Sequence, residues 1–213
     1  AGYDNLNLDL MYALPGQDLA MALHDVERAI ALQPAHLSHY QLTMEPNTAF
    51  AARPPAGLPD EDSAWDIQER CIEAMAGAGY AQYEVSAYSK PGANCRHNRN
   101  YWSFGDYLGI GAGAHSKLSF AHRVVRQVRF RDPARYMDNA LAGHAVAQDD
   151  EVRRADLPFE YMLNALRLRE GFALQDFMAR TGLPLSSIAA GLAEAESKGL
   201  ITQHMGRVVP TER

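Results

Sequence analysis

The sequence predicts an α/β protein, in which a parallel βαβαβ unit, equal to half of a barrel, precedes a small helical domain with a winged-helix outline. Apolar and polar residues alternate at the start of the chain, which indicates a strand with two different faces. Strand patterns then alternate with helical patterns as far as residue 88, as in a parallel sheet. From residue 152 onwards the pattern is helical and closes with a short hairpin.

The first strand is expected at residues 5–10, where Leu6, Leu8 and Leu10 alternate with polar residues. Asp18 is a suitable N-cap for a helix that ends before Pro34. A complete eight-unit barrel needs roughly 250 residues, and an isolated half would expose a sheet edge. Because the chain also begins without Met, we expect a fragment of a longer protein. The remaining elements expected here are a strand at 36–45, a proline-rich loop at 46–59, a helix at 60–76 and a strand at 80–88.

The middle of the chain, residues 89–151, departs from this pattern. It is rich in glycine as far as Gly113, and the segments 117–120 and 123–130 then predict a hairpin. A helix is expected at 132–141 and a linker at 143–151. The chain is therefore expected to form one domain at residues 1–142 and a second at residues 152–213.

The last segment predicts a small module of helices and one hairpin. Basic and acidic side chains are equal in number between residues 151 and 213. A neutral module releases few counterions on DNA, so we expect it to pack or to dock a partner rather than to bind nucleic acid. The expected elements are helices at 152–169, 174–180 and 185–198 and a hairpin of 200–202 with 207–209.

The composition is that of an ordinary globular protein. The 213 residues carry a net charge of −6, with a pI near 5.7, which argues against nucleic acid and anionic lipid as general partners. No apolar run approaches the roughly 20 residues of a membrane span. Two cysteines, Cys71 and Cys95, are too few for a disulfide scaffold or a four-thiolate metal site. A reducing cytoplasm is the simplest location.

Asp9 is the first candidate site residue. If the leucines of the first strand face the helices, then Asn5, Asn7 and Asp9 face the inside of the barrel. A carboxylate there costs several kcal/mol (order of magnitude) unless it is paired or hydrogen-bonded. Ligand hydroxyls would be natural partners near the C-terminal end of a strand. The alternative is an Asp that caps the next turn or pairs with an Arg.

The other two strands offer polar side chains whose direction the sequence leaves open. In the second strand, Ser38, Tyr40 and Leu42 share one face, and His39 lies on the other. In the third, we expect Glu84, Ser86 and Tyr88 to share a face. A single Glu inside a barrel could hold a cation or a hydroxyl, although such residues are more often salt-bridged.

The segment from Cys95 to Trp102 is the densest in chemically active groups. His97 could ligate haem iron through a neutral imidazole, and Tyr101 and Trp102 could flank a planar macrocycle. Arg96 or Arg99 could pair with its propionates, because a guanidinium matches a carboxylate. The alternative is a loop with packed aromatic rings and a solvated histidine.

Two further motifs are weaker. The glycine-rich stretch from Gly109 to His115 resembles a phosphate-binding loop, but it opens no clear helix. We therefore expect its glycines to let the backbone come close to a ligand or to a neighbouring strand. His115 and Ser116 could form a catalytic pair, but no acidic partner is near in sequence. The basic residues of the expected hairpin are either a solvated face or an anion site; they are Arg123, Arg126, Arg129 and Arg131.

Four ordered segments together resemble a known family. They are NLDLMYALPGQ, HLSHYQLTMEPNTAF, YEVSAYSKPGANCRHNRNYW and YLGIGAGAHS. These segments, between residues 7 and 116, resemble the radical S-adenosylmethionine family of the haem chaperone HemW, long described as oxygen-independent coproporphyrinogen III oxidase. The tail from Val152 is similar to the family's C-terminal helical domain. The resemblance implies the C-terminal half of a partial (β/α)6 barrel of the radical S-adenosylmethionine type.

The resemblance also implies roles for single residues. Asp9 stands in the family's D-L-x-x-G-L-P-G-Q segment, whose Asp holds the ribose hydroxyls of S-adenosylmethionine. Ala13 replaces the usual Gly of that segment, a small change that should stiffen the turn. Tyr40 and Leu42 are expected near the adenine.

A second motif of the family concerns haem. His97, Asn98, Tyr101 and Trp102 match its H-N-x-x-Y-W pattern, which is associated with haem handling. This match makes His97 a candidate ligand of haem iron.

The family's cluster motif C-x-x-x-C-x-x-C is absent from this sequence. We therefore expect no [4Fe–4S] cluster and no cleavage of S-adenosylmethionine by this chain alone. The resemblance implies a protein that binds haem and passes it to haem-requiring targets. The alternative is an enzyme that decarboxylates coproporphyrinogen III propionates, and a third hypothesis is a docking module centred on the C-terminal domain.

Overall fold

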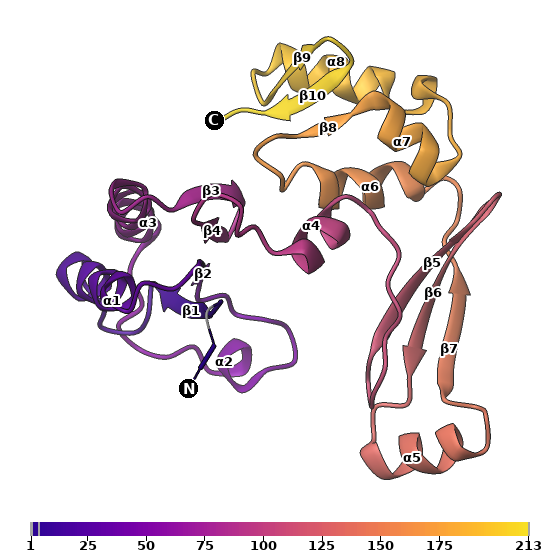
Figure 1. Ribbon diagram of the computed structural model, residues 1–213, viewed down its shortest axis with the longest axis horizontal. Coiled ribbons are helices and arrows are strands. Elements are labelled where there is room, and N and C mark those ends of the chain that lie inside the picture. The colour runs from indigo at the N-terminus through magenta and orange to yellow at the C-terminus, as the bar shows by residue number, and fades with distance from the viewer. Residues whose placement is uncertain (1, 4, 213) are drawn as a thin grey trace. The chain divides into compact units, whose positions relative to one another are not determined.

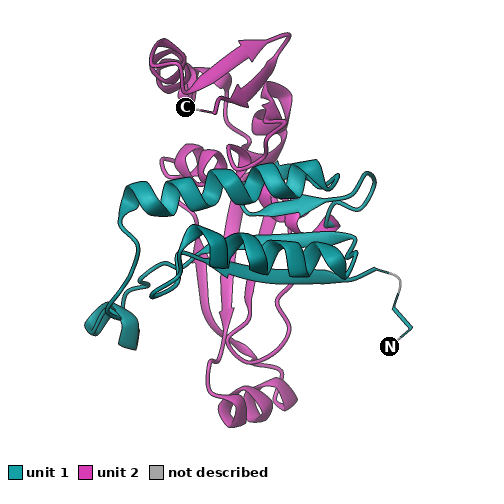
Figure 2. Cartoon of the chain, turned by 90° about the vertical axis from the view of Figure 1, so that its left-hand side faces the viewer, with its two compact units in different colours: residues 1–95 teal, residues 96–213 magenta. Residues whose placement is uncertain are grey.

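The structure is a computed structural model that describes residues 2–3 and 5–212. The chain is a mixed α/β protein that divides into two compact units, residues 1–95 and residues 96–213, shown in different colours in Figure 2. Each unit has a hydrophobic core and at least one sheet of its own. The expected border between residues 142 and 152 lies inside the second unit, and that border stays a prediction.

The first unit contains a four-stranded sheet in the order β1-β2-β4-β3 (Figure 1). β1 (Asn7–Tyr12) and β2 (His36–Gln41) are parallel, and α1 (Leu19–Ala31) connects them. Asp18 caps α1, because its Oδ1 accepts a hydrogen bond of 2.8 Å from the backbone N–H of Met21. The predicted strand–helix–strand start of the chain is therefore confirmed.

The third expected strand is instead a hairpin. β3 (Ala81–Glu84) pairs antiparallel with β4 (Ala87–Ser89), and β4 pairs antiparallel with β2. The prediction of an all-parallel βαβαβ unit is therefore wrong at its last strand. The chain reverses at Val85-Ser86, and a short apolar pattern does not distinguish one strand from two shorter ones.

Two helices, α1 and the later helix α3 (Glu61–Gly77), cover one face of this sheet (Figure 1). α3 is close to the helix expected at 60–76 and is capped by Asp60, while α2 (Ala49–Ala52) is a short helix inside the expected loop at 46–59. Burial raises the pKa of the Cys71 thiol to about 11, so this cysteine is an inert core residue. The core between sheet and helices includes Val26, Leu37, Ile67, Cys71 and Met75.

The second unit contains an antiparallel sheet in the order β5-β6-β7 (Figure 1). β5 (His115–Phe120) and β6 (Arg123–Arg129) form the predicted hairpin, and α5 (Pro133–Leu141) is the predicted helix. The expected linker at 143–151 is wrong, because it contains β7 (Val146–Glu151). β7 is an edge strand without a buried side chain, so it lacks the apolar alternation by which a strand is recognised.

The end of the chain consists of three α-helices, one 3₁₀ turn and a sheet in the order β8-β10-β9 (Figure 1). The helix expected from residue 152 begins later, because Pro158 fits only the first turn of a helix. The expected helix at 185–198 is interrupted at Ile188. The elements are α6 (Leu157–Ala165), β8 (Phe172–Ala173), α7 (Leu174–Thr181), η1 (Leu185–Ser187), α8 (Ala189–Ser197), β9 (Ile201–His204) and β10 (Arg207–Pro210).

Aromatic rings hold the core of the second unit together. The ring of Tyr161 makes edge contacts with Phe104, Phe172 and Phe177, at centroid distances of 5.5, 5.2 and 5.2 Å. Such pairs contribute about 0.5–1.5 kcal/mol each beyond their buried area. Phe104 follows α4 (Arg96–Trp102) closely, so the core reaches the end of this helix. None of the helices in the described part of the chain combines the length and the apolar character that a membrane span needs.

His39 makes the stability of the first unit dependent on pH. It is 5% exposed and stacks on Tyr12 at 4.4 Å, and burial lowers its pKa to about 4. The unfolded chain binds a proton to this residue below about pH 6.5, so stability falls as the pH drops from 6.5 towards 4. We expect His39→Phe to remove roughly 3 kcal/mol of that fall. Urea unfolding at pH 7 and at pH 4.5 gives the free energy of unfolding at each pH, and the difference between the two values measures the fall.

His204→Phe is the matched control, because His204 is exposed. It should leave the pH dependence unchanged. An equal fall in wild type and His39→Phe would contradict the assignment.

Candidate functional site

The residues expected to bind ligands fall into two groups, one in each unit. Asp9, Tyr40 and Leu42 belong to the first unit, and the segment from His97 to Trp102 belongs to the second.

The open face of the first sheet, which α1 and α3 leave uncovered, carries Asp9. Leu8 and Leu10 pack against the core on the helix side. Because side chains alternate along a strand, Asn7, Asp9 and Met11 point to the opposite face, and all three are exposed. The sequence argument for the direction of Asp9 thus agrees with the geometry of β1.

The pairing of β1 with β2 settles the face that the sequence left open. Ser38 lies opposite Asp9 in the register, and Tyr40 lies opposite Met11. Tyr40 therefore shares the open face with Asp9 and is 43% exposed. Leu42 follows the end of β2, where its backbone N–H donates to Tyr12 O at 2.9 Å.

The carboxylate of Asp9 is held by a neighbour that sequence analysis did not select. Nδ2 of Asn7 donates to Oδ1 of Asp9 at 2.7 Å. Asn7 is itself fixed, since its Oδ1 faces Nδ1 of His36 at 2.6 Å and accepts from Ser38 Oγ at 3.1 Å. Burial lowers the pKa of His36, while the charge of Asp9 acts in the opposite direction. His36 is therefore neutral at pH 7.

The expectation that Glu84 and Tyr88 share a face is wrong. Tyr88 lies opposite Leu37 and belongs to the core on the helix side, whereas Glu84 lies opposite Ala87. The reversal at Val85 places the two residues on different strands and therefore breaks the alternation on which the expectation rests.

The turn after β1 holds Ala13 in the left-handed region, with φ at +56°. Glycine reaches this region without cost, whereas other residues pay roughly 1–2 kcal/mol there. Ala13 is buried. An alanine at this position therefore stores strain in the turn that follows β1.

The segment from Cys95 to Trp102 contains a helix, α4, rather than a loop. His97 and Tyr101 are one turn apart, so both lie on the same side of α4. Arg96 and His97 are exposed, whereas Arg99 is ion-paired with Glu170. An exposed imidazole with an exposed guanidinium beside it is therefore available to a ligand.

The two aromatic residues of α4 are partly engaged in packing. Tyr101 contacts the ring of Trp102 at 4.9 Å and that of Tyr107 at 5.2 Å. The guanidinium of Arg167 lies 4.1 Å from the ring centroid of Trp102. Nε1 of Trp102 is buried without a hydrogen-bond partner among the described residues. A ligand at α4 would therefore meet Tyr101 and Trp102 as a packed pair.

A buried cation fixes the end of α4. Nζ of Lys117 donates to Phe104 O at 2.9 Å, to Asp106 Oδ1 at 3.0 Å and to Ser119 Oγ at 2.9 Å. Lys117 is 2% exposed, and burial lowers its pKa while Asp106 opposes that shift. Three donated bonds use its full capacity, so the segment after α4 is held rigidly on β5.

The same segment needs a glycine. Phe104 has φ at +56°, and a Cβ on Gly105 would lie 2.7 Å from the backbone oxygen of Asn100. The amide of Asn100 also donates to Asp106 O at 2.9 Å. The chain therefore closes directly against the last turn of α4.

The glycine-rich stretch approaches a strand rather than a phosphate. A Cβ on Gly109 would lie 2.1 Å from His115 O, and Gly109 N–H donates to Ser116 Oγ at 2.9 Å. Ser116 is buried while its neighbour His115 is exposed, so they do not form a catalytic pair. The expectation of close backbone approach is confirmed at Gly109.

The arginines of the hairpin are largely committed to contacts within the second unit. Nε of Arg126 donates to Glu160 at 2.9 Å, and Nε of Arg129 donates to Gly109 O at 3.2 Å. Arg123 lies 5.1 Å from the ring of Phe120. A common anion site is therefore not formed by these side chains.

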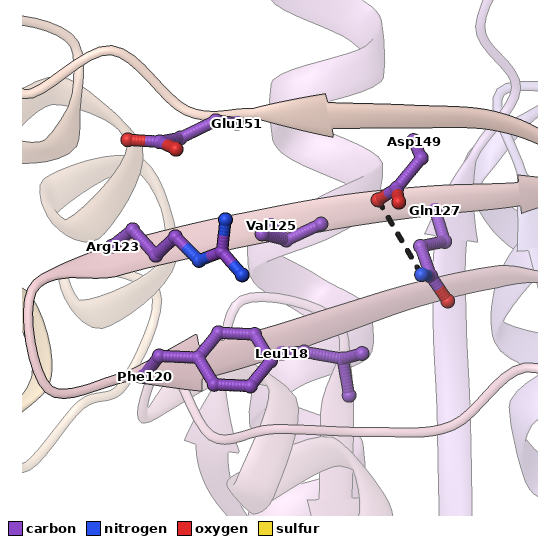
Figure 3. A pocket seen from close by; sticks show the side chains of 7 residues that line it. All are labelled: Leu118, Phe120, Arg123, Val125, Gln127, Asp149 and Glu151. Carbon is purple, nitrogen blue, oxygen red and sulfur yellow. Dashed lines mark hydrogen bonds between the residues drawn. The ribbon is translucent and has the colours of Figure 1, made fainter.

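A shallow hollow of about 230 Å³ lies on one face of the β5–β6–β7 sheet (Figure 3). Its wall combines apolar side chains with one cation and two carboxylates, and Gln127 donates to Asp149 at 3.4 Å. Arg123, one of the arginines considered for an anion site, lines it, whereas Asp9, Tyr40, Leu42 and the segment from His97 to Trp102 do not. The lining residues are Leu118, Phe120, Arg123, Val125, Gln127, Asp149 and Glu151.

Metal-ligating groups are sparse. No group of three or more His, Cys, Asp or Glu side chains suited to a metal ion occurs in residues 2–3 and 5–212. Cys71 is in the core, and Cys95 is half-buried. These thiols do not fit an iron–sulfur cluster, which needs several converging thiolates.

Comparison with solved structures defines the class of fold. The chain matches a structure described as "Coproporphyrinogen III oxidase (HemN) from Escherichia coli is a Radical SAM enzyme" with a TM-score of 0.75. The match covers 99% of this chain and 52% of that one, at 20% sequence identity. Residues 152–213 match the family described as HemN C-terminal domain. The chain therefore has the fold of about half of a HemN-type protein.

Sequence similarity is more specific. The chain is 47% identical over 203 residues to "Heme chaperone HemW" of Escherichia coli (strain K12), covering 95% of this chain and 52% of that protein. It is 48% identical over 189 residues to the protein of that name in Haemophilus influenzae, covering 88% and 48%. The chain is thus similar in sequence to the HemW haem chaperones and spans about half the length of these relatives.

The role of Lys117 can be tested by stability. Lys117→Met leaves Phe104 O without its donor and Asp106 without its cation, which should lower the free energy of unfolding by about 2–3 kcal/mol. Urea denaturation followed by circular dichroism measures this loss. The surface pair of Lys198 with Glu194 is the control, and Lys198→Met should cost less than about 0.5 kcal/mol. Equal losses in the two variants would refute the proposed role.

Proposed function

We propose that the chain is the C-terminal portion of a cytoplasmic haem chaperone, which binds haem and passes it to haem-requiring proteins. The identity of 47% to a HemW haem chaperone over 95% of the chain is the observation that carries this proposal. Transfer of haem from the protein in its full natural length to a haem-free acceptor tests it. Failure of transfer by a haem-loaded protein would contradict it.

The finer architecture belongs to the same proposal. The first unit supplies one flank of a partial (β/α)6 barrel, and its open face lines the interior. The parallel pair β1–β2, with α1 and α3 on one side and polar residues on the other, supports this. The three helices and the β8-β10-β9 sheet form a winged-helix-like domain for packing or docking, supported by their order along the chain.

Asp9 would hold S-adenosylmethionine through its ribose. The carboxylate is exposed on the open face, and Asn7 engages only its Oδ1. A vicinal diol can donate to the other oxygen, so the donor set fits. Tyr40, on the same face, and Leu42, after the end of β2, would lie near the adenine. When bound, S-adenosylmethionine supplies a sulfonium that a reduced cluster can cleave, but the cysteines of this chain do not fit such a cluster.

Haem is the proposed cargo, with His97 as a ligand of its iron. The imidazole is exposed on α4, and the neighbouring Arg96 is exposed and able to pair with a propionate. Tyr101 and Trp102 would flank the macrocycle, together with Asn98. Because Lys117 holds the segment after α4, the helix would present these side chains from a rigid base.

The alternative function is radical decarboxylation of coproporphyrinogen III propionates. The fold similarity to a coproporphyrinogen III oxidase favours it, although at 20% identity this similarity concerns the fold alone. An assay for protoporphyrinogen formation by the protein in its full natural length, loaded with its cluster, separates the two. Sustained turnover would overturn the chaperone proposal.

His97→Ala should weaken haem binding at least tenfold, because iron loses its protein ligand while α4 keeps its packing. Titration with haemin, followed at the Soret band, measures the change. His122 is an exposed histidine of the same unit, so His122→Ala is the control and should bind haem like the wild type. An unchanged Soret titration for His97→Ala would refute the ligand assignment.

Asp9→Ala should weaken binding of S-adenosylmethionine by about 1.5–3 kcal/mol, the contribution of a hydrogen bond to a charged group. Isothermal titration calorimetry on the protein in its full natural length measures the affinity. Glu69 is exposed on α3, so Glu69→Ala should leave the affinity unchanged. Equal affinities of Asp9→Ala and wild type would show that Asp9 does not contact the ligand.

A further inference from the structure

A row of hydrogen bonds crosses the open face of the first unit and ends at Asp9. It starts at the backbone N–H of Cys95, which donates to Oη of Tyr83 at 3.3 Å. Tyr83 Oη is 2.8 Å from Nε2 of His36, and Nδ1 of His36 is 2.6 Å from Oδ1 of Asn7. Nδ2 of Asn7 completes the row with its bond of 2.7 Å to Asp9.

Chemistry fixes the direction of each bond in this row. The carboxylate of Asp9 can only accept, so Asn7 must present its NH₂ to Asp9 and its oxygen to His36. That oxygen requires an N–H on Nδ1 of His36. In a neutral imidazole, Nε2 then carries the lone pair and accepts a hydrogen bond from the hydroxyl of Tyr83. Every donor therefore points towards Asp9, and such aligned bonds strengthen one another.

Burial makes the middle of the row rigid and leaves its end accessible. His36 is 5% exposed and Ser38, which also donates to Asn7, is 3% exposed. Asn7 and Asp9 are exposed. If the amide of Asn7 rotated by 180°, its oxygen would face the Asp9 carboxylate, and its NH₂ would face the donors of His36 and Ser38. The buried donors therefore determine the orientation of an exposed amide.

We propose that His36 and Tyr83 are positioning residues for a nucleoside ligand at Asp9. They hold the Asn7 amide so that it binds Oδ1, which leaves Oδ2 of Asp9 directed at a ligand diol. Among the described residues, Oδ2 has no hydrogen-bond partner. This inference rests on the proposed binding of S-adenosylmethionine, and it adds residues that touch the ligand only through Asn7 and Asp9.

A pair of substitutions at His36 distinguishes a role in positioning Asn7 from a role in the stability of the fold alone. The side-chain amide of Asn can occupy the place of Nδ1, and that of Gln the place of Nε2. His36→Asn thus keeps the donor to Asn7, whereas His36→Gln loses it. With S-adenosylhomocysteine as the calorimetric probe, we expect His36→Gln to bind about fivefold more weakly, as for one lost hydrogen bond. His36→Asn should remain within about twofold of the wild type.

A second pair of variants tests the row at its far end. Tyr83→Phe removes the hydroxyl that donates a hydrogen bond to His36 and should weaken binding of the probe by a similar factor of about five. Tyr80→Phe is the matched control, because the Tyr80 hydroxyl donates to Pro34 O at 2.7 Å and lies outside the row. It should bind the probe like the wild type. Nitrogen-15 spectra of the imidazole should show His36 as the Nδ1–H tautomer at pH 7 in the wild type.

The outcomes distinguish this inference from the function on which it rests. If the wild type does not bind the probe, nucleoside binding at Asp9 fails, and the positioning roles fail with it. If Asp9→Ala weakens binding but His36→Gln and Tyr83→Phe bind like the wild type, only the positioning roles are overturned. An Nε2–H tautomer of His36, or equal losses in His36→Asn and His36→Gln, would also overturn them.

Discussion

The alternation of side chains along β1 is the constraint on which the proposed nucleoside site depends. Leu8 and Leu10 must be buried against the helices, and this burial stabilises the unit by roughly 25 cal/mol for each Å² removed from water. Asp9 therefore cannot turn inwards without exposing both leucines. A shift of the register by one residue would exchange the two faces, so the hydrophobic core fixes the polar face as well.

The sequence allowed the prediction of elements with a strong local signal. The cap at Asp18 is a short-range feature, and α1 begins where this residue predicts. β7 was missed because an exposed edge strand is held by backbone hydrogen bonds that leave no hydrophobic pattern. The candidate site shows the same limit of local sequence patterns. The direction of Asp9 follows from the alternation of side chains along β1. Its connection to His36 through Asn7 depends instead on the pairing of two strands that are far apart in sequence.

In the second unit, contacts with neighbouring residues stabilise α4, the candidate haem-binding helix. α4 is short, and isolated helices of such length are unstable in water. Its stability must come from its surroundings: a residue at positive φ, a glycine against the last turn, and a buried ammonium with three acceptors. These features could not be predicted, because Lys117 is distant from α4 in sequence and lysine is rarely buried.

The contrast between the two cysteines has a practical consequence. Cys71 is 0% exposed and its thiol is hard to ionise, whereas Cys95 is half-buried. Alkylating reagents attack thiolates, so a maleimide dye or nitroxide should attach to Cys95 first in the folded chain. A label at that position would lie next to the helix that carries His97. In this chain, Cys95 thus provides an attachment point from which distances to an added porphyrin can be followed by fluorescence quenching, without engineering a new thiol.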